Sequence, residues 1–280
     1  MIERALTNAK KNRKPIRHLI GALIAGLVLA NVNGAIAEDQ QPTASAIVLG
    51  LGVGALPQYE GSKDYRPIPV LHASYRDGWF YAVFDTTTLK VNLLPVEGFD
   101  AGPLARYRLG RGSVENDAVD DLSNFDDAIE IGGFLRYTVT NAADRRYRFG
   151  AEFDVATDVN SGHDGAIATL SAYYGHPWGR FAQLIIGVFS SYADDDYMDT
   201  YFGIDAADSA RSGLDQYSAD AGIKDIGLTA RLVHDFAPNW GGELRIRVSR
   251  LLGDAKDSPV VADEGSATQV FFGGLTTYKF

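Results

Sequence analysis

The chain has 280 residues, with 26 Lys and Arg against 36 Asp and Glu, and it contains no cysteine. Its formal net charge of −10 argues against nucleic acid as a partner, because binding to phosphates requires a basic surface. The lack of cysteine excludes both a disulfide framework and a catalytic thiolate.

A cleavable secretory signal peptide is predicted over residues 1–37. A basic segment ending at Arg17 precedes the apolar run Leu19 to Ala30, and Ala35-Ile36-Ala37 forms a small-x-small cleavage site before Glu38. The apolar run is too short for a spanning helix, which needs about 20 residues. An uncleaved anchor is the alternative. Removing residues 1–37, with their six Lys/Arg and one Glu, takes the formal charge from −10 to −15.

The remaining chain, residues 38–280, is predicted to be a single domain rich in β-strands. It contains no apolar run of about 18 residues, so only a closed barrel could span a membrane. In chain order, the clearest strands are predicted at Ser45–Leu56, Ile68–Tyr75, Trp79–Asp85, Leu89–Leu94, Phe99–Leu109, Ile129–Val139, Tyr147–Val159, Leu244–Val248 and the C-terminal stretch that ends at Phe280.

Alternation of residue type along these strands indicates which face contacts water. From Tyr147 onward the odd positions are mostly apolar, whereas the even positions include Arg148, Glu152 and Asp154. A charged inner wall and an apolar outer wall are typical of a transmembrane barrel. A soluble sandwich shows the same alternation turned inside out, so periodicity alone leaves both open. The opposite signs on the inner face, with Arg146 and Arg148 near Glu152 and Asp154, suggest that ion pairs fill the lumen.

The connections favour the barrel. Short turns alternate with longer loops, as in barrels with turns in the periplasm and loops outside. This alternation predicts an up-and-down antiparallel barrel of twelve strands, provided that Trp79–Leu94 is two strands; ten strands is the alternative. The last strand carries Tyr278 and Phe280 at its tip, where aromatic side chains would join the interfacial girdle.

No catalytic, cofactor or metal site is predicted. The histidines lack zinc-ligand spacing. The acidic run Asp194 to Asp196 with Asp199 lacks the glycine and distal glutamate of a calcium loop, so a solvated acidic loop is the better interpretation. A serine hydrolase in the barrel wall is the enzymatic alternative. Ser161 and His163 share a loop, but no spacing rule makes them a catalytic pair.

Several loop motifs, taken in order, resemble the MltA-interacting protein (MipA/OmpV) family of the outer membrane. They are Pro57-x-Tyr59-Glu60-Gly61-Ser62, Pro67-x-Pro69, Gly102-Pro103, Gly162-His163-x-Gly165, Tyr201-Phe202, Leu251-x-Gly253-Asp254-Ala255-x-x-Ser258-Pro259 and the terminal Tyr278-x-Phe280. We expect Gly61, Gly102, Gly253 and Pro259 to set loop geometry. Tyr59, Tyr201 and Phe202 are interpreted as interfacial anchors.

The resemblance implies a non-enzymatic barrel in the outer membrane of a Gram-negative cell, in contact with its lipid. It also implies a scaffold that brings a lytic transglycosylase together with a bifunctional murein synthase, a penicillin-binding protein. No catalytic or ligand residue is inherited with it. The small periplasm-facing surface weakens the scaffold hypothesis slightly. The alternatives are a pore for small solutes and a surface adhesin that acts through the long acidic loops.

Overall fold

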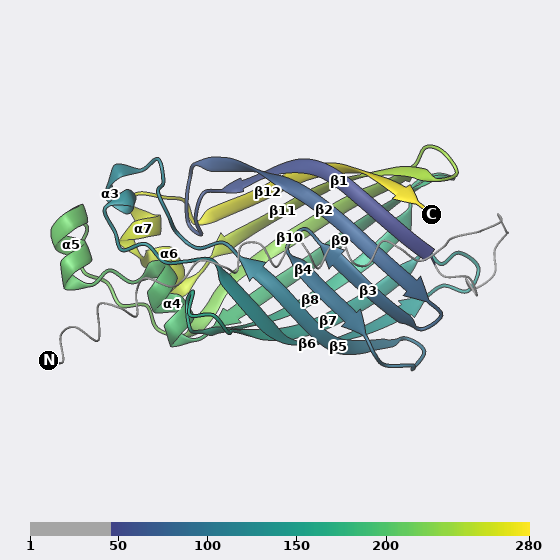
Figure 1. Ribbon diagram of the computed structural model, residues 1–280, viewed down its shortest axis with the longest axis horizontal. Coiled ribbons are helices and arrows are strands. Elements are labelled where there is room, and N and C mark those ends of the chain that lie inside the picture. Colours follow the sequence, from purple (N-terminus) through teal and green to yellow (C-terminus); the bar gives the residue numbers. More distant parts are fainter. Residues whose placement is uncertain (1–45) are drawn as a thin grey trace, which may run out of the picture. The chain divides into compact units, whose positions relative to one another are not determined.

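The computed structural model describes residues 46–280 and contains one closed antiparallel barrel. Each strand pairs with its neighbours in the chain, and the first strand pairs with the last (Figure 1). The strands are β1 (Ala46–Pro57), β2 (Tyr65–Asp77), β3 (Phe80–Asp85), β4 (Thr88–Asn92), β5 (Phe99–Arg108), β6 (Ala128–Thr140), β7 (Arg148–Asp158), β8 (Ala166–Pro177), β9 (Ala182–Ala193), β10 (Gly222–Asp235), β11 (Trp240–Leu251) and β12 (Thr268–Lys279).

The prediction of a twelve-strand up-and-down barrel is therefore confirmed, and the ten-strand alternative is wrong. Residues 80–92 form two short strands rather than one. The predicted signal peptide, residues 1–37, lies outside the described residues and stays a prediction.

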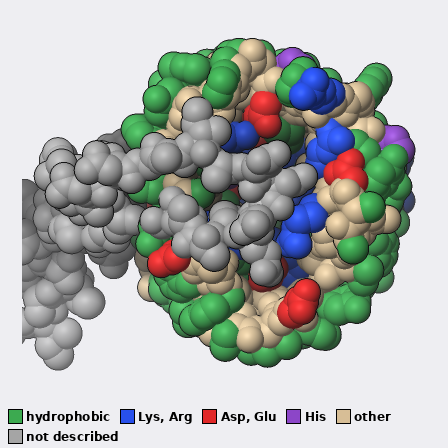
Figure 2. Space-filling view, turned by 90° about the vertical axis from the view of Figure 1, so that its right-hand side faces the viewer, with side chains coloured by type: hydrophobic (Ala, Val, Ile, Leu, Met, Phe, Trp, Pro, Cys, Tyr) green, Lys and Arg blue, Asp and Glu red, His purple; other side chains and the backbone are tan. Residues whose placement is uncertain are grey.

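The faces of the wall follow the alternation of the sequence. In β7, Phe153 and Val155 point outward and are 47% and 44% exposed, whereas Glu152 and Asp154 point inward and are buried. Figure 2 looks at the end of the barrel that carries the C-terminus: apolar side chains ring the outside, and Lys, Arg, Asp and Glu side chains lie inside the ring. The wall is thus suited to lipid outside and to water or ion pairs inside.

Glycines in β1 allow a close approach of the first and last strands. A Cβ added to Gly52 would lie 1.9 Å from the carbonyl oxygen of Gly274 in β12. Gly50 and Gly54 share this face with Gly52, as the sequence pattern predicted. Because β1 and β12 close the barrel, side chains at these positions would force the seam apart.

The two ends of the barrel differ. Short turns and the C-terminus lie at one end, called here the turn end (Figure 1). At the other, the loop end, the long connections carry five short helices: α3 (Asp117–Asp120), α4 (Asp195–Phe202), α5 (Ala206–Ser212), α6 (Gly253–Asp257) and α7 (Pro259–Ala262). Among the helices within residues 46–280, none has the length and apolar character needed to cross a membrane.

Aromatic side chains surround the turn end. Trp79, Trp178 and Trp240 are all about half exposed, and Tyr278 packs against Trp240 with 4.8 Å between ring centroids. Phe280 is also exposed, and its backbone N–H donates to the Ile47 carbonyl at 3.0 Å. The terminal strand therefore closes the barrel and adds to an aromatic girdle.

Candidate functional site

Glu130, on β6, is the centre of the charge network inside the barrel. Its side chain is fully buried and accepts hydrogen bonds from Arg106 and Arg108 on β5. The His163 ring lies 3.1 Å from it through Nε2, and His163 Nδ1 accepts a hydrogen bond from the Gly165 N–H. The second bond assigns the ring proton to Nε2, so His163 donates to the carboxylate. The buried carboxylate is stabilised here because Arg106, Arg108 and His163 all donate hydrogen bonds to it.

Further ion pairs line the lumen, and several of them join strands that are not adjacent. Glu152 on β7 pairs with Lys90 on β4 and with Arg136 on β6, and Asp154 accepts from Arg106 at 2.7 Å. On the other side of the lumen, Arg245 on β11 contacts Glu243 on the same strand and Asp85 on β3. The Arg245–Asp85 pair crosses the interior, because β3 and β11 lie four strands apart in the barrel.

The expectation that Arg146 and Arg148 neutralise Glu152 and Asp154 is wrong. Arg146 pairs with Asp144 at the turn end. Arg148 has no ion-pair partner among the described residues, and its Nε is buried without a hydrogen bond. The reason is geometric: residues four apart in a strand are separated by about 13 Å, whereas neighbouring strands lie about 5 Å apart. Ion pairs do occupy the lumen, but most of them form between strands.

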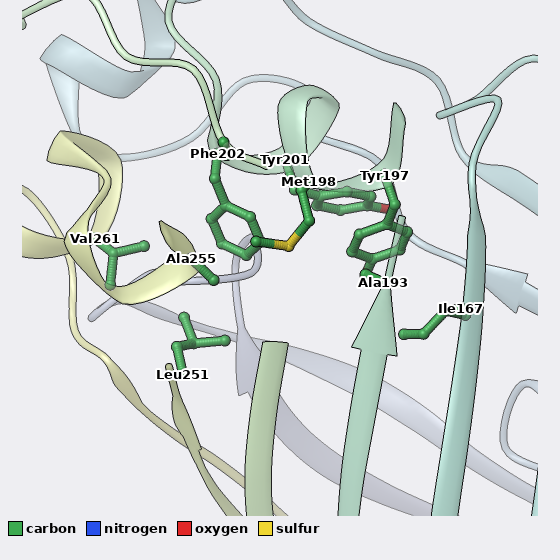
Figure 3. Packing of buried hydrophobic residues seen from close by; sticks show 10 residues of the cluster. Ile167, Ala193, Tyr197, Met198, Tyr201, Phe202, Leu251, Ala255 and Val261 are labelled. Atoms are coloured by element: carbon green, nitrogen blue, oxygen red, sulfur yellow. The ribbon is translucent and has the colours of Figure 1, made fainter. Parts of the chain in front are cut away.

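The loop end is closed by a compact body that we call the cap, formed by the connection between β1 and β2 together with the three connections that contain α3 to α7. One apolar cluster includes Tyr197, Met198, Tyr201 and Phe202 of α4 together with Leu251, Ala255 and Val261. Figure 3 shows the Phe202 ring lying between Met198 and Ala255. A second cluster joins α3, through Val119 and Leu122, to Tyr59, Ile204 and Val260. The cap therefore has its own apolar core, drawn from four separate connections.

Hydrogen bonds at the helix ends fix the cap. Asp194 is the N-cap of α4 and accepts from the Tyr197 N–H, while its other oxygen accepts from the Ala166 N–H at 2.8 Å. Asp195 accepts from the Ala221 N–H. The acidic run Asp194 to Asp196 thus contributes to helix capping and loop attachment. Within residues 46–280, no group of three or more His, Asp or Glu side chains is arranged to hold a metal ion.

Glu60 connects the cap to the lumen. Its carboxylate accepts from the Tyr197 hydroxyl at 2.6 Å and from Lys224 of β10. Lys224 is 2% exposed and also contacts Asp225 at 2.8 Å. The Tyr197 ring lies under the Arg108 guanidinium, with 5.2 Å between Cζ and the ring centroid, and stacks on Tyr201 at 4.5 Å. Glu60 is therefore a direct tie between the first long loop, α4 and the barrel wall.

Burial controls the protonation of the cap tyrosines. It raises the pKa of Tyr59 above the usual value for a phenol, and it raises the pKa values of Tyr197 and Tyr201 further. All three phenols are therefore protonated near neutral pH. This state is required for the Tyr197 hydroxyl to donate to Glu60.

Below the cap, the lumen contains a cavity of about 830 Å³, which we call the lumen cavity. Nine Lys and Arg side chains line it against five Asp and Glu. Nine basic side chains still exceed seven acidic ones when Glu130 and Glu243, which pair with the lining residues Arg106 and Arg231, are added. Arg66, Arg148 and Arg247 line this cavity and have no ion-pair partner among residues 46–280; the Nε atoms of Arg66 and Arg148 are buried without a hydrogen bond. Arg247 lies over the Phe189 ring, 3.4 Å from its centroid.

A smaller hollow of about 520 Å³ lies in the cap itself. It is lined by Arg111 and by the aspartates Asp199, Asp205 and Asp208. Arg111 donates to the carbonyl oxygens of Tyr201 and Ser123, and Asp208 accepts from Ser123. These bonds join α4, α5 and the loop before β6, so this hollow is part of the cap structure, although Arg111 Nε is buried without a hydrogen bond.

Most of the residues in the family-like motifs gather in the cap. Glu60, His163 and Tyr201 lie around the junction described above, and Tyr278 and Phe280 lie at the turn end. Ser258 is fully buried and donates to the Phe202 carbonyl at 2.6 Å. The other motif residues in the cap and its connections are Pro57, Tyr59, Gly61, Ser62, Gly162, Gly165, Phe202, Gly253, Asp254 and Pro259.

Two interpretations of these residues are wrong. Tyr59, Tyr201 and Phe202 are not interfacial anchors, because their side chains are buried in the two cap clusters. Gly102 and Pro103 lie within β5 and not in a loop; a Cβ on Gly102 would lie 2.0 Å from the Val91 carbonyl oxygen. In contrast, Gly61 and Gly253 have φ angles of +101° and +50°, as expected for residues that set loop geometry.

Lys224 was missed by the sequence analysis. The pairing of β9 and β10 shifts between Ile223 and Asp225, and both Lys224 and Asp225 are buried. A β-bulge of this kind lets two consecutive residues face the same side. The adjacent charges at the start of a strand were the available signal, because strict alternation would have exposed one of them to lipid.

Comparison with known proteins gives a family match over most of the chain. The sequence model described as MltA-interacting protein MipA matches residues 49–280. YiaT of Escherichia coli, named as an outer membrane protein, is 29% identical over 215 residues, which cover 73% of this chain and 82% of YiaT.

Solved structures with similar folds are more distant. An outer membrane channel from Pseudomonas putida has a TM-score of 0.39 at 11% identity, over 89% of this chain and 100% of that one. The translocator domain of the autotransporter NalP from Neisseria meningitidis has a TM-score of 0.36 at 9% identity, over 93% of each chain. At such scores neither structure bears on what this chain does.

Proposed function

The chain belongs to the MltA-interacting protein MipA family of outer-membrane barrels, and we propose that it is a gated channel that binds and passes small anionic solutes. The observation that carries this proposal is the charge of the lumen cavity. Nine basic side chains line it against five acidic ones, although the chain as a whole is acidic. Unpaired guanidinium groups in such a cavity favour carboxylates and phosphates.

The gate in this proposal is the cap. It closes the loop end through an apolar core, and Glu60 ties it to the wall through Lys224. Opening requires that this tie breaks, because α4 and the loop before β2 both depend on it. A Glu60→Gln variant removes the charge from the tie and leaves Lys224 with Asp225 alone. We therefore expect this change to raise the fraction of time that the channel is open.

Conductance in planar lipid bilayers tests the proposal. A salt gradient should give a reversal potential of anion-selective sign, and Glu60→Gln should open more often than the unmodified protein. The matched control is Asp257→Asn, an exposed carboxylate of α6 paired only with Lys256 among the described residues. Cation selectivity, or no conductance from either Glu60→Gln or the unmodified protein, would refute the channel.

A scaffold for murein enzymes is the second candidate, favoured by the family description as MltA-interacting. In this proposal the turn end faces the periplasm and binds a lytic transglycosylase and a bifunctional penicillin-binding protein, without catalysis by the barrel itself. The lack of cysteine allows a site-specific test. A cysteine placed at Ala143, in the β6–β7 turn, should cross-link to these enzymes in intact envelopes. A cysteine placed at Ala207, in α5 of the cap, should not cross-link to them. Equal yields from both positions would refute a turn-end scaffold.

A further inference from the structure

The wall of the barrel is interrupted above the hairpin formed by β3 and β4. These strands have six and five residues, whereas β2 has 13 and β5 has 10. Pairing between β2 and β3 begins at His72, and the next contact toward the loop end is the Thr86 N–H, which donates to the Leu71 carbonyl at 2.7 Å. Residues 65–70 of β2 therefore pair with β1 on one edge only.

Two prolines mark this free edge. Backbone groups of an antiparallel strand point to one neighbour and then to the other in turn, so residues two apart share an edge. The Leu71 carbonyl faces the β3 side, and Pro69 and Pro67 lie on the same edge as Leu71. Neither has an N–H to leave unsatisfied. The sequence thus avoids unpaired donors at the positions where the wall lacks a strand.

A frame of described residues surrounds the gap, which we call the window. Its lower border is the hairpin tip, Thr86 to Thr88, and its sides carry Ile68 of β2 and Leu109 after β5. Above it, the loop after β5 reaches across to the loop after β1, since the Glu115 N–H donates to Gln58 Oε1 at 3.0 Å. All of these residues except Glu115 line the lumen cavity. The cavity therefore extends to the window.

The window lies at membrane depth. The hairpin rises six residues from the turn end, about 20 Å along a strand. With the usual tilt of about 35–45°, its tip stands roughly 15 Å above the turn end, inside an apolar band about 25 Å tall. A free sheet edge at this depth is tolerated where it borders a cavity but not where it meets hydrocarbon alone.

We propose that the window is a lateral binding site through which a single-chain anionic amphiphile passes between the membrane and the lumen cavity. Arg66 lies on the inward face of β2 beside Ile68, with its Nε buried and unbonded. Its guanidinium receives the anionic head group, and the apolar chain occupies the space bordered by Leu56, Ile68 and Leu109. The head-group assignment rests on the anion-binding lumen proposed above, whereas the lateral route rests on the interrupted wall.

The hairpin tip is fixed from inside, so the window is a built feature of the fold. Asp85, next to the tip, accepts a hydrogen bond from Arg245 across the lumen, and His72 lies 3.8 Å from it. Arg245 also reaches the Thr86 hydroxyl at 3.3 Å. Thr86 itself adopts a φ of 56°, which a β-branched residue rarely takes without such constraints.

Photo-cross-linking in lipid vesicles tests the proposal. The probe is a twelve-carbon carboxylate with a diazirine near the end of its chain, compared with a trimethylammonium that carries the same chain. We expect the carboxylate to label the window or the lumen face behind it, and the ammonium not to. Arg66→Gln should reduce the yield about tenfold, the lower range for a lost charged hydrogen bond.

Two matched variants separate the lateral route from axial entry. Ile68→Trp fills the window, and Ile185→Trp adds the same bulk to the lumen cavity from the uninterrupted wall of β9. Ile68→Trp should abolish labelling, whereas Ile185→Trp should retain it. Equal loss in both, or labelling that survives Ile68→Trp, would overturn the inference. If labelling at the window is absent while the bilayers still show anion selectivity, only the window fails. If both are absent, the proposed channel fails with it.

Discussion

The lumen and the cap are stabilised by opposite chemistry, although they share a border at Glu60. In the lumen, buried carboxylates such as Glu130 are surrounded by donors from a neighbouring strand and from the loop after β7. In the cap, Phe202 and Val260 are fully buried among apolar side chains, as in a small soluble domain. The lumen keeps a cavity of about 830 Å³ between its side chains, whereas the helices of the cap pack against one another. We therefore expect the two regions to unfold separately.

The largest effect is expected from Glu130→Ala. This change leaves Arg106 and Arg108 without their buried partner and should lower the free energy of unfolding of the whole barrel by about 3–5 kcal/mol. Urea unfolding in lipid vesicles measures it. Glu130→Gln keeps the shape of the side chain and one carbonyl acceptor, so it should lower the free energy of unfolding by less. If both variants unfold like the unmodified protein, the lumen is not held by its charges.

Met198→Ala tests the cap alone. Met198 is 1% exposed in the α4 cluster, and truncating a buried methionine costs about 2–5 kcal/mol. That loss should appear as faster hydrogen exchange in α4, α6 and α7, with the urea midpoint of the barrel unchanged. A matching fall in the barrel midpoint would show that cap and lumen unfold as one unit.

High pH should open the cap before it affects the barrel. Burial raises the pKa values of Tyr59, Tyr197 and Tyr201 in the closed cap, while an opened cap titrates at the ordinary value of about 10. The contribution of these tyrosines to the stability of the closed cap is therefore fully present below about pH 10. Above that pH it falls by about 1.4 kcal/mol per pH unit for each tyrosine.

Ultraviolet absorbance of tyrosinate follows this titration. We expect a group of tyrosines that ionise together at a pH above the ordinary value, and Tyr201→Phe should reduce the number of tyrosines in this group by one. Ionisation of every tyrosine in a single step near pH 10 would contradict the burial of this cluster.

The smallest effect concerns a single helix end. Asn116 is the N-cap of α3, where its side chain accepts from the Val119 N–H at 3.0 Å, and it donates to Glu264 of the connection after α7. Asn116→Ala should cost about 1 kcal/mol, and hydrogen exchange should detect it within α3. Asn116→Asp keeps the cap acceptor but faces Glu264. A difference between the two variants separates capping from the tie to Glu264.

The sequence predicts the wall better than the cap, for a physical reason. Alternation along a strand is a local pattern, so Phe153 and Glu152 can be assigned to opposite faces before their neighbours are known. The partners of Glu152 are Lys90 and Arg136, which are distant in the chain, and no spacing rule gives them. The same holds for Tyr59 and Phe202, whose burial depends on how four connections meet.

The interrupted wall lies between these cases. The pattern Pro67-x-Pro69 is one of the family-like motifs. Its effect depends on the strand alone, because prolines two residues apart remove N–H donors from one edge of that strand. The missing neighbour could be inferred only once β3 was known to end at Asp85. A proline pair inside a long barrel strand is therefore a signal for a free edge.

The seam between the first and last strands also constrains the order of events during biogenesis. Val48 pairs with Lys279 and Ala55 with Phe272, so closure joins parts of the chain that are synthesised at opposite times. Until the last strand arrives, β1 has an open edge on that side, and contacts of such long sequence separation form slowly. A nascent chain of this protein therefore carries β1 with one unpaired edge for almost the whole of its synthesis, because the strand that covers this edge, β12, is made last.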